Sequence, residues 1–280
     1  MNSSIALVVL DSVRKDVFDK YFDWLPGIRF ENAYSTGNYS IPAHGSLFGG
    51  RYPSELGVHA KSQVLDCPES VLAERLRDSG YRTRAYSANA LIGPEFGFDR
   101  GFDEFNLRWN LSDSIPEFFP WREELTGDNT SILDYPRAVM NCVLDSNSNS
   151  LQSIKRAFDI YSYNDEGASE ALKFLDTIDF GDSEFLFLNL MEAHWPYWGE
   201  AEFLTYNDNP VDANSETIPG GDINLFAHRE GYNEWVAYLS KMYKQILDRL
   251  LNDFEYIVTI ADHGDLFGEH GAKAHYYGLF

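Results

Sequence analysis

Hydrophobic and polar positions along the chain predict strands that alternate with helices. Ile5 to Leu10 is a continuous apolar and β-branched run, which is typical of a strand buried on both faces of a parallel sheet. Three further strands are predicted, over Arg82 to Ala88, Glu184 to Met191 and Tyr256 to Ala261. We therefore expect an α/β fold, with a mostly parallel central sheet flanked by helices.

Three helices are predicted around these strands. In the first, Asp66 is the expected N-cap, Glu69 completes a capping box and Gly80 ends the helix. The other two are predicted over Ala168 to Ile178 and over Glu234 to Asn252, where the pattern is amphipathic. The spacing of strands and helices is compatible with one domain over residues 1–280.

Two stretches of the chain lack a clear hydrophobic periodicity. Around 106–165, Trp, Pro, Asn and Ser are mixed, which favours an insertion with short helices, such as a lid. Residues 200–232 are expected to be rich in loops and contain the turn sequence Pro219-Gly220-Gly221.

Composition narrows the function classes. The chain has 280 residues, of which 44% are hydrophobic, and it is rich in aromatic residues, which indicates a globular protein. Its formal net charge of -22 opposes binding to nucleic acids and to anionic membranes. The excess acid favours a salt-adapted protein, because salt screens such repulsion. An ordinary acidic protein is the alternative.

Cysteine usage and the N-terminus favour the cytoplasm. Cys67 and Cys142 are the only cysteines, and we interpret both as free thiols in a reducing compartment. The apolar run near the N-terminus is short, ends in Asp11 and lacks a basic start, so we do not interpret it as a signal peptide. No stretch approaches the roughly 18 apolar residues that a membrane span needs.

Polar residues follow three of the predicted strands. They are Asp11, then Glu192 and His194, then Asp262 and His263. In open α/β sheets, ligands bind at the carboxyl ends of strands, and neighbouring carboxylate and imidazole groups suit a metal ion. Each group also has a plainer interpretation. Asp11 could be a helix N-cap, His194 a structural histidine, and Asp262-His263 part of a capped turn with a solvated histidine.

Ser40 is the candidate nucleophile. It precedes Ile41-Pro42 and the start of a predicted small-residue helix. The positive field at a helix N-terminus would attract an anionic ester and favour an alkoxide. The alternative is that Ser40 is only an N-cap.

Taken in order, these motifs resemble the sulfatase family of the alkaline phosphatase superfamily. The matching segments share the family's order along the chain and are Asp11, Ser40-Ile41-Pro42-Ala43-His44, Gly80-Tyr81-Arg82-Thr83, His194-Trp195-Pro196-Tyr197, Asp262-His263-Gly264 and Gly268-Glu269-His270-Gly271. The resemblance implies a sulfatase-like sheet and an ester hydrolase or transferase. The excess of acidic residues favours a salt-adapted, archaeal-like member. The chain departs from the family in ending soon after the last motif, so we expect a C-terminally short member without the usual C-terminal subdomain.

The resemblance also implies a metal site. Asp11, Ser40, Asp262 and His263 occupy the positions of the ligands of one divalent cation, which is Ca²⁺, Mg²⁺, Mn²⁺ or Zn²⁺. Members with two metal ions usually carry an additional Asp-x-x-x-His pair. No such pair is found near the third strand, and Ser12 stands where many sulfatases have a second Asp, so a single-metal site is expected.

Further roles follow by position. Ser40 is implied as the nucleophile, His194 as the histidine that contacts the ester or its leaving group, and His44 as a catalytic residue beside the nucleophile. Asn89 and His275 are implied as substrate-binding residues.

One departure from the sulfatase pattern, at the position of the motif's arginine, leaves the class of substrate open. Sulfatases make formylglycine from Cys or Ser in a Cys/Ser-x-Pro-x-Arg motif, whereas this chain has Ser40 and His44. An unmodified serine would resemble the Ser/Thr branch of the superfamily, which acts on phosphoesters and phosphonates. We expect a hydrolase of small-molecule or glycan sulfate or phosphate esters that uses Ser40 or its formylglycine derivative. A metal-binding domain without catalysis, truncated or completed by a partner, is the alternative.

Overall fold

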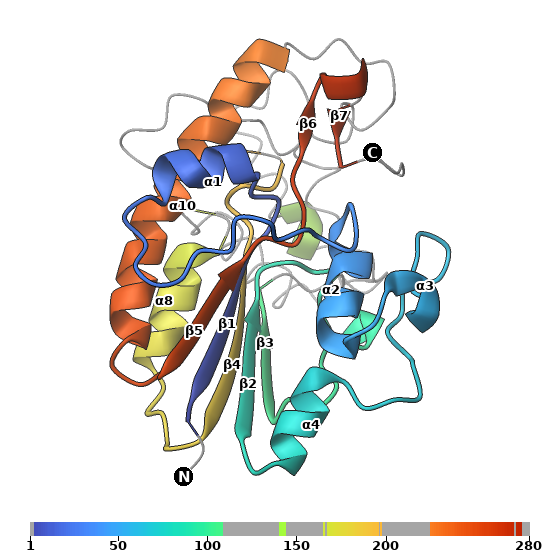
Figure 1. Ribbon diagram of the computed structural model, residues 1–280, viewed down its shortest axis with the longest axis vertical. Helices are drawn as coiled ribbons and strands as arrows, with labels where there is room; N and C mark the ends of the chain where they lie inside the picture. Colours follow the sequence, from blue (N-terminus) through green and yellow to red (C-terminus); the bar gives the residue numbers. More distant parts are fainter. Residues whose placement is uncertain are drawn as a thin grey trace.

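A parallel sheet forms the centre of the computed structural model, which describes residues 3–108, 140–143, 165, 167–195, 197, 225–271 and 273–275. Its five strands lie in the order β3-β2-β4-β1-β5, and every neighbouring pair is parallel (Figure 1). They are β1 (Ile5–Leu10), β2 (Arg82–Ser87), β3 (Glu104–Leu107), β4 (Glu184–Leu190) and β5 (Tyr256–Ile260).

Helices lie on both faces of this sheet (Figure 1). One face packs against α1 (Lys15–Tyr21), α8 (Ala168–Asp176) and α10 (Leu225–Leu250). The other face packs against α2 (Ser40–Gly49), α3 (Pro53–Leu56) and α4 (Leu72–Asp78). The remaining short elements are η1 (Pro94–Phe96), β6 (Leu266–Phe267), η3 (Glu269–Gly271) and β7 (Lys273–Ala274).

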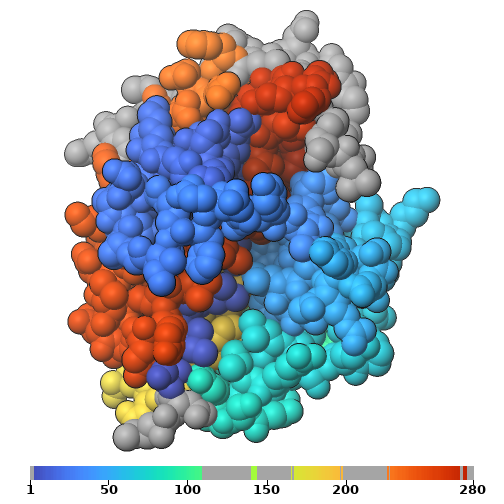
Figure 2. Space-filling view, in the orientation of Figure 1, coloured from blue at the N-terminus to red at the C-terminus, as the bar shows by residue number. Residues whose placement is uncertain are grey.

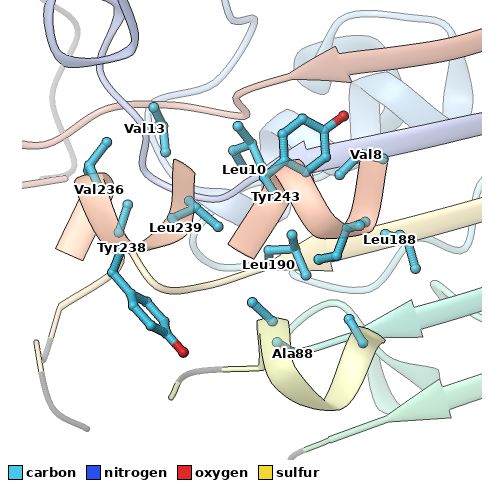
Figure 3. Packing of buried hydrophobic residues seen from close by; sticks show 14 of the residues in the cluster. Val8, Leu10, Val13, Ala88, Leu188, Leu190, Val236, Tyr238, Leu239 and Tyr243 are labelled. Atoms are coloured by element: carbon cyan, nitrogen blue, oxygen red, sulfur yellow. The ribbon is translucent and has the colours of Figure 1, made fainter. Parts of the chain in front are cut away.

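Alternation along the strands divides the core into two layers. In β1, Val8 and Leu10 face the layer of α8 and α10, whereas Leu7 and Val9 face the layer of α2 and α4. Figure 3 shows the first layer, where side chains of α10 such as Leu239 pack against β1 and β4. Burial on both faces explains why these strands are almost continuously apolar.

The carboxyl ends of β1, β4 and β5 meet at one edge of the sheet, at the top in Figure 1. The backbone N–H of Asp11 donates to the Leu190 carbonyl at 2.9 Å, so pairing of β1 with β4 continues one residue past the strand. Figure 2 shows the segment between α1 and α2, in blue, lying across the molecule at this level. The polar residues after the three strands therefore gather at one place.

Most of the predicted elements are confirmed. The four predicted strands correspond to β1, β2, β4 and β5, and the predicted helix over Ala168 to Ile178 corresponds to α8. Strand β3 was not predicted; its residues are only half-buried, so its apolar signal is weak. Neither Cys67 nor Cys142 is in a disulfide, as expected, and both are buried. Among the described residues, none of the helices is both long and apolar enough to cross a membrane.

Two predicted helix starts are wrong. Helix α4 begins at Leu72 with Val71 as N-cap, because the Glu74 carboxylate, and not that of Glu69, accepts the N-cap N–H at 3.0 Å. Helix α10 begins at Leu225, so residues 225–232 of the expected loop are helical; Gly231 within them obscured the helical signal. The expected insertion around 106–165 lies mostly outside the described residues, and its first residues belong to β3.

Candidate metal centre and active site

Ser40 lies at the first residue of α2, with Tyr39 as the N-cap. Its hydroxyl oxygen is 3.4 Å from Oδ2 of Asp11, 3.3 Å from Nε2 of His263 and 3.2 Å from Nδ2 of Asn89. The side chain is buried, with 3% exposure. A hydroxyl held among a carboxylate, an imidazole and an amide, at the positive end of a helix, is placed for nucleophilic chemistry.

Asp262 follows β5 and has two differently placed oxygens. Its Oδ1 accepts the backbone N–H of Ser12 at 3.1 Å and that of His263 at 2.8 Å. Among the described residues, Oδ2 is buried and has no hydrogen-bond partner, although Nε2 of His263 lies 3.4 Å away. One oxygen thus fixes the carboxylate, and the other is left for a ligand.

These side chains fit a divalent cation. One ligand atom from each of Asp11, Asp262 and His263 lies within 4.8 Å of the other two, and all three residues are buried. Two buried carboxylates this close repel each other unless a cation lies between them. Burial alone would raise the pKa of Asp11, but neighbouring histidines, His194 foremost, lower it to about 2, so it is ionised.

Asn89 follows β2 and links the carboxylate to the nucleophile. Its Nδ2 donates to Oδ2 of Asp11 at 2.8 Å, besides its contact with Ser40. Its Oδ1 accepts the N–H of Leu91 at 2.9 Å, which fixes the orientation of the amide. The amide therefore presents its donors to the site.

His44 lies one helical turn after Ser40 and is fully buried. Its Nδ1 is 2.9 Å from the Ser40 carbonyl oxygen and 3.5 Å from Oδ2 of Asp262. The edges of its ring meet Phe98 and Phe187. His44 therefore contacts the backbone of the nucleophile and a predicted metal ligand from behind the site.

His194 and His275 lie beside the same centre, with ring centroids 5.0 Å apart. Burial lowers the pKa of His194. Burial acts in the same direction on His275, but Asp265, whose Oδ1 is 2.8 Å from Nδ1 of His275, raises its pKa. Asp265 and His275, together with His263, form a second group of ligand-type side chains that shares His263 with the first.

A family comparison decides the assignment: the model of the family described as Sulfatase matches residues 20–279. The chain belongs to the sulfatase family. A sequence search of curated proteins found no match.

Solved structures share the sulfatase-like fold at low identity. The C-terminal periplasmic domain of phosphoethanolamine transferase EptC from Campylobacter jejuni is 16% identical, with a TM-score of 0.55, and the match covers 98% of this chain and 73% of that domain. Phosphonate monoester hydrolase from Agrobacterium radiobacter is 15% identical, with a TM-score of 0.57 and coverages of 100% and 66%. A putative sulfatase from Bacteroides thetaiotaomicron is 14% identical, with a TM-score of 0.58 and coverages of 100% and 62%. The chain thus spans less than two thirds of the last two proteins.

Every residue predicted for the site of this sulfatase-family chain lies in one cluster or touches it. The plainer interpretations of three of them are wrong. Asp11 is no N-cap, since α1 begins at Lys15 with Arg14 as its cap. Ser40 is the first helical residue, not the cap, and His263 is buried, not solvated.

Two contributors were missed. Asp265 orients the His275 ring, and only its position three residues after Asp262 could have drawn attention to it. Ser12 was noted for lacking a carboxylate, yet it contributes its backbone N–H to Asp262. A backbone donor leaves no trace in residue identity, so the sequence carried no signal for it.

Proposed function

We propose that this chain is a metal-dependent hydrolase or transferase of sulfate or phosphate esters, with Ser40 as the nucleophile. The observation that carries the proposal is the placement of the Ser40 hydroxyl beside Asp11 and His263. Oδ2 of Asp262, which has no hydrogen-bond partner among the described residues, lies 3.4 Å from Nε2 of the same His263. A bound divalent cation would supply positive charge for the ester oxygens and would lower the pKa of the hydroxyl.

The chain's own residues supply the remaining steps. The Ser40 hydroxyl releases its proton to solvent water as its oxygen attacks the sulfur or phosphorus atom, and the bond to the leaving oxygen breaks. The Asn89 amide, already oriented toward Ser40 at 3.2 Å, donates to an ester oxygen as charge develops there. Water, or an acceptor hydroxyl in a transferase, then takes the group from Ser40 and restores the hydroxyl.

The leaving oxygen needs a proton, and His194 and His275 are the histidines placed to give it. The hydrogen bond from Nδ1 of His275 to Asp265 leaves the other ring nitrogen of His275 available. This pairing stabilises the protonated ring, whereas burial favours neutral His194. We therefore assign proton donation to His275 and contact with the leaving group to His194. His44, which is fully buried, supports Ser40 and Asp262 without touching the ester.

Unmodified Ser40 is the form we propose, because His44 replaces the arginine of the motif that is converted to formylglycine. Esters of phosphate or phosphonate, on small molecules or glycans, are then the preferred substrates. The mass of the peptide containing Ser40, from protein made in its native host, checks this. A serine mass supports the proposal, and an aldehyde mass would identify a sulfatase that uses formylglycine.

Replacing Ser40 by Ala tests the nucleophile. With Mn²⁺ present, Ser40→Ala should lower kcat on bis-p-nitrophenyl phosphate or p-nitrophenyl sulfate by about a thousandfold or more, because no covalent intermediate can form. Ser46→Ala is the matched control, since Ser46 lies in the same helix and is also buried. It should change kcat by less than about threefold.

The outcomes separate the alternatives. Full turnover by Ser40→Ala would exclude the proposed nucleophile. Calorimetric Mn²⁺ binding by the unaltered protein, without turnover of either ester class, would support a metal-binding domain without catalysis.

A further inference from the structure

The turn after β1 joins two of the predicted metal ligands through an unfavourable backbone conformation. Ser12 has φ of 62°, in the left-handed region that residues with a Cβ avoid. In this conformation its N–H donates to Oδ1 of Asp262 at 3.1 Å, while Asp11 directs its carboxylate to Ser40. The positions of both carboxylates therefore depend on Ser12 staying in this conformation.

One distant side chain holds this turn. Tyr232, in the N-terminal half of α10, is fully buried, and its hydroxyl donates to the Ser12 carbonyl oxygen at 2.9 Å. The same hydroxyl accepts the backbone N–H of Arg14 at 2.8 Å. Both bonds go to the main chain, so they fix the path of residues 12–14.

The side chain at the C-terminal end of this segment makes further contacts. The Arg14 side chain donates to the Asp265 carbonyl oxygen at 2.9 Å and pairs with Glu269 at 2.8 Å. These bonds join the segment to the chain after β5, but they do not reach the Ser12 carbonyl. Among the described residues, the hydroxyl of Tyr232 is the group that binds this carbonyl.

We propose that Tyr232 is a positioning residue for the metal centre, and this inference rests on the proposed function. Its hydroxyl stabilises the left-handed conformation of Ser12 and so keeps Asp11 and Asp262 at the separation that a cation requires. Groups beyond the direct ligands that orient them commonly change metal affinity by about 10- to 100-fold.

Tyr232→Phe isolates the hydroxyl. The aromatic ring packs against Phe267 at 4.9 Å and Tyr197 at 5.9 Å between centroids, and phenylalanine retains both contacts. Tyr243→Phe is the matched control, because Tyr243 is a fully buried tyrosine of the same helix whose hydroxyl bonds Thr259, on β5 (Figure 3 shows Tyr243). Each variant loses one buried hydroxyl, but Tyr232→Phe loses two hydrogen bonds and Tyr243→Phe one, so Tyr232→Phe should lower Tm somewhat more.

The experiment is calorimetric titration of Mn²⁺ into the unaltered protein and both variants. Tyr232→Phe should weaken Mn²⁺ binding by about tenfold or more, and Tyr243→Phe by less than about twofold. In a Ser12→Gly background, Tyr232→Phe should cost less than about threefold, because glycine adopts positive φ without a steric penalty.

Each alternative result would overturn a specific part of this inference. Unchanged Mn²⁺ affinity in Tyr232→Phe, or equal losses in the two tyrosine variants, would overturn the positioning role while leaving the proposed function intact. An undiminished loss in the Ser12→Gly background would overturn the route through the Ser12 conformation. Failure of the unaltered protein to bind Mn²⁺ would overturn the inference and the proposed function together.

Discussion

Glu192 follows β4 and is fully buried at the start of α8. Its Oε1 accepts the N–H of Ala168 at 2.5 Å, but its Oε2 has no partner among the described residues. Burial, assisted by the nearby Asp165 carboxylate, raises the pKa of Glu192 to about 8. The folded protein therefore prefers Glu192 protonated, two residues before His194.

This raised pKa predicts how stability depends on pH. Between the ordinary glutamate pKa of 4.5 and about 8, the folded state binds the proton of Glu192 and the unfolded state releases it. The contribution of Glu192 to stability is thus present below pH 4.5 and is lost as pH rises through 8, by at most about 1.4 kcal/mol per pH unit. Glu192→Gln should remove this decline and raise the free energy of unfolding at pH 8.

Urea unfolding of the two proteins between pH 5 and pH 8 provides the measurement. Asp78→Asn, at a side chain that is 70% exposed, is the control and should leave the slope unchanged. A Glu192→Gln variant that still loses stability over this range as steeply as the unaltered protein would contradict the assignment.

The close contact between helix α4 and the loop before β3 depends on a glycine. Gly101 has φ of 83°, and a Cβ built on it would lie 2.2 Å from the backbone nitrogen of Glu74. The carbonyl of Gly101 also accepts the hydroxyl of Thr83 at 2.7 Å, on β2. Three elements thus approach at a point where no side chain fits.

Gly101→Ala should therefore destabilise the fold more than backbone strain alone explains. Gly80→Ala is the control, because Gly80 has φ of 89° but a Cβ there would meet nothing within 4 Å. Gly80→Ala should lower the free energy of unfolding by about 1–2 kcal/mol, and Gly101→Ala by roughly a further 1–3 kcal/mol from overpacking. Urea unfolding provides the measurement. Equal losses of unfolding free energy in the two variants would mean that the backbone around Gly101 moves to accept the methyl group at no cost in free energy.

The whole molecule carries 44 acidic and 22 basic residues, for a net charge of -22. Repulsion of this size opposes a compact state, and salt screens it over a Debye length that falls from about 10 Å at 0.1 M to about 3 Å at 1 M. We expect Tm to rise by several degrees between 0.1 M and 2 M KCl, with most of the rise below 1 M. NaCl at the same concentrations should raise Tm by the same amount, because screening depends on ionic strength. A flat or falling Tm would contradict salt adaptation.

Local patterns of hydrophobic and polar residues predicted most of the fold. Strand β1 was predictable because burial on both faces leaves a continuous apolar run, whereas half-buried β3 had too weak a pattern. The start of α10 was missed because packing stabilises helical residues 225–232 that propensity alone does not favour. For the site, the order of motifs indicated Asp11, Ser40, Asp262 and His263 as ligands, and the structure brings all four together.

The sequence by itself determined which residue types stand at the ends of the strands, and that a serine begins helix α2, because these follow from local periodicity and residue identity. Only the tertiary structure decided that His44 contacts Asp262, that Asp265 orients His275, and that Tyr232 holds Ser12. Tyr232 and Ser12 are 220 residues apart, and their hydrogen bond depends on the packing of α10 against the end of β1. Distances between segments so remote are set by the packed core, and no local pattern encodes them.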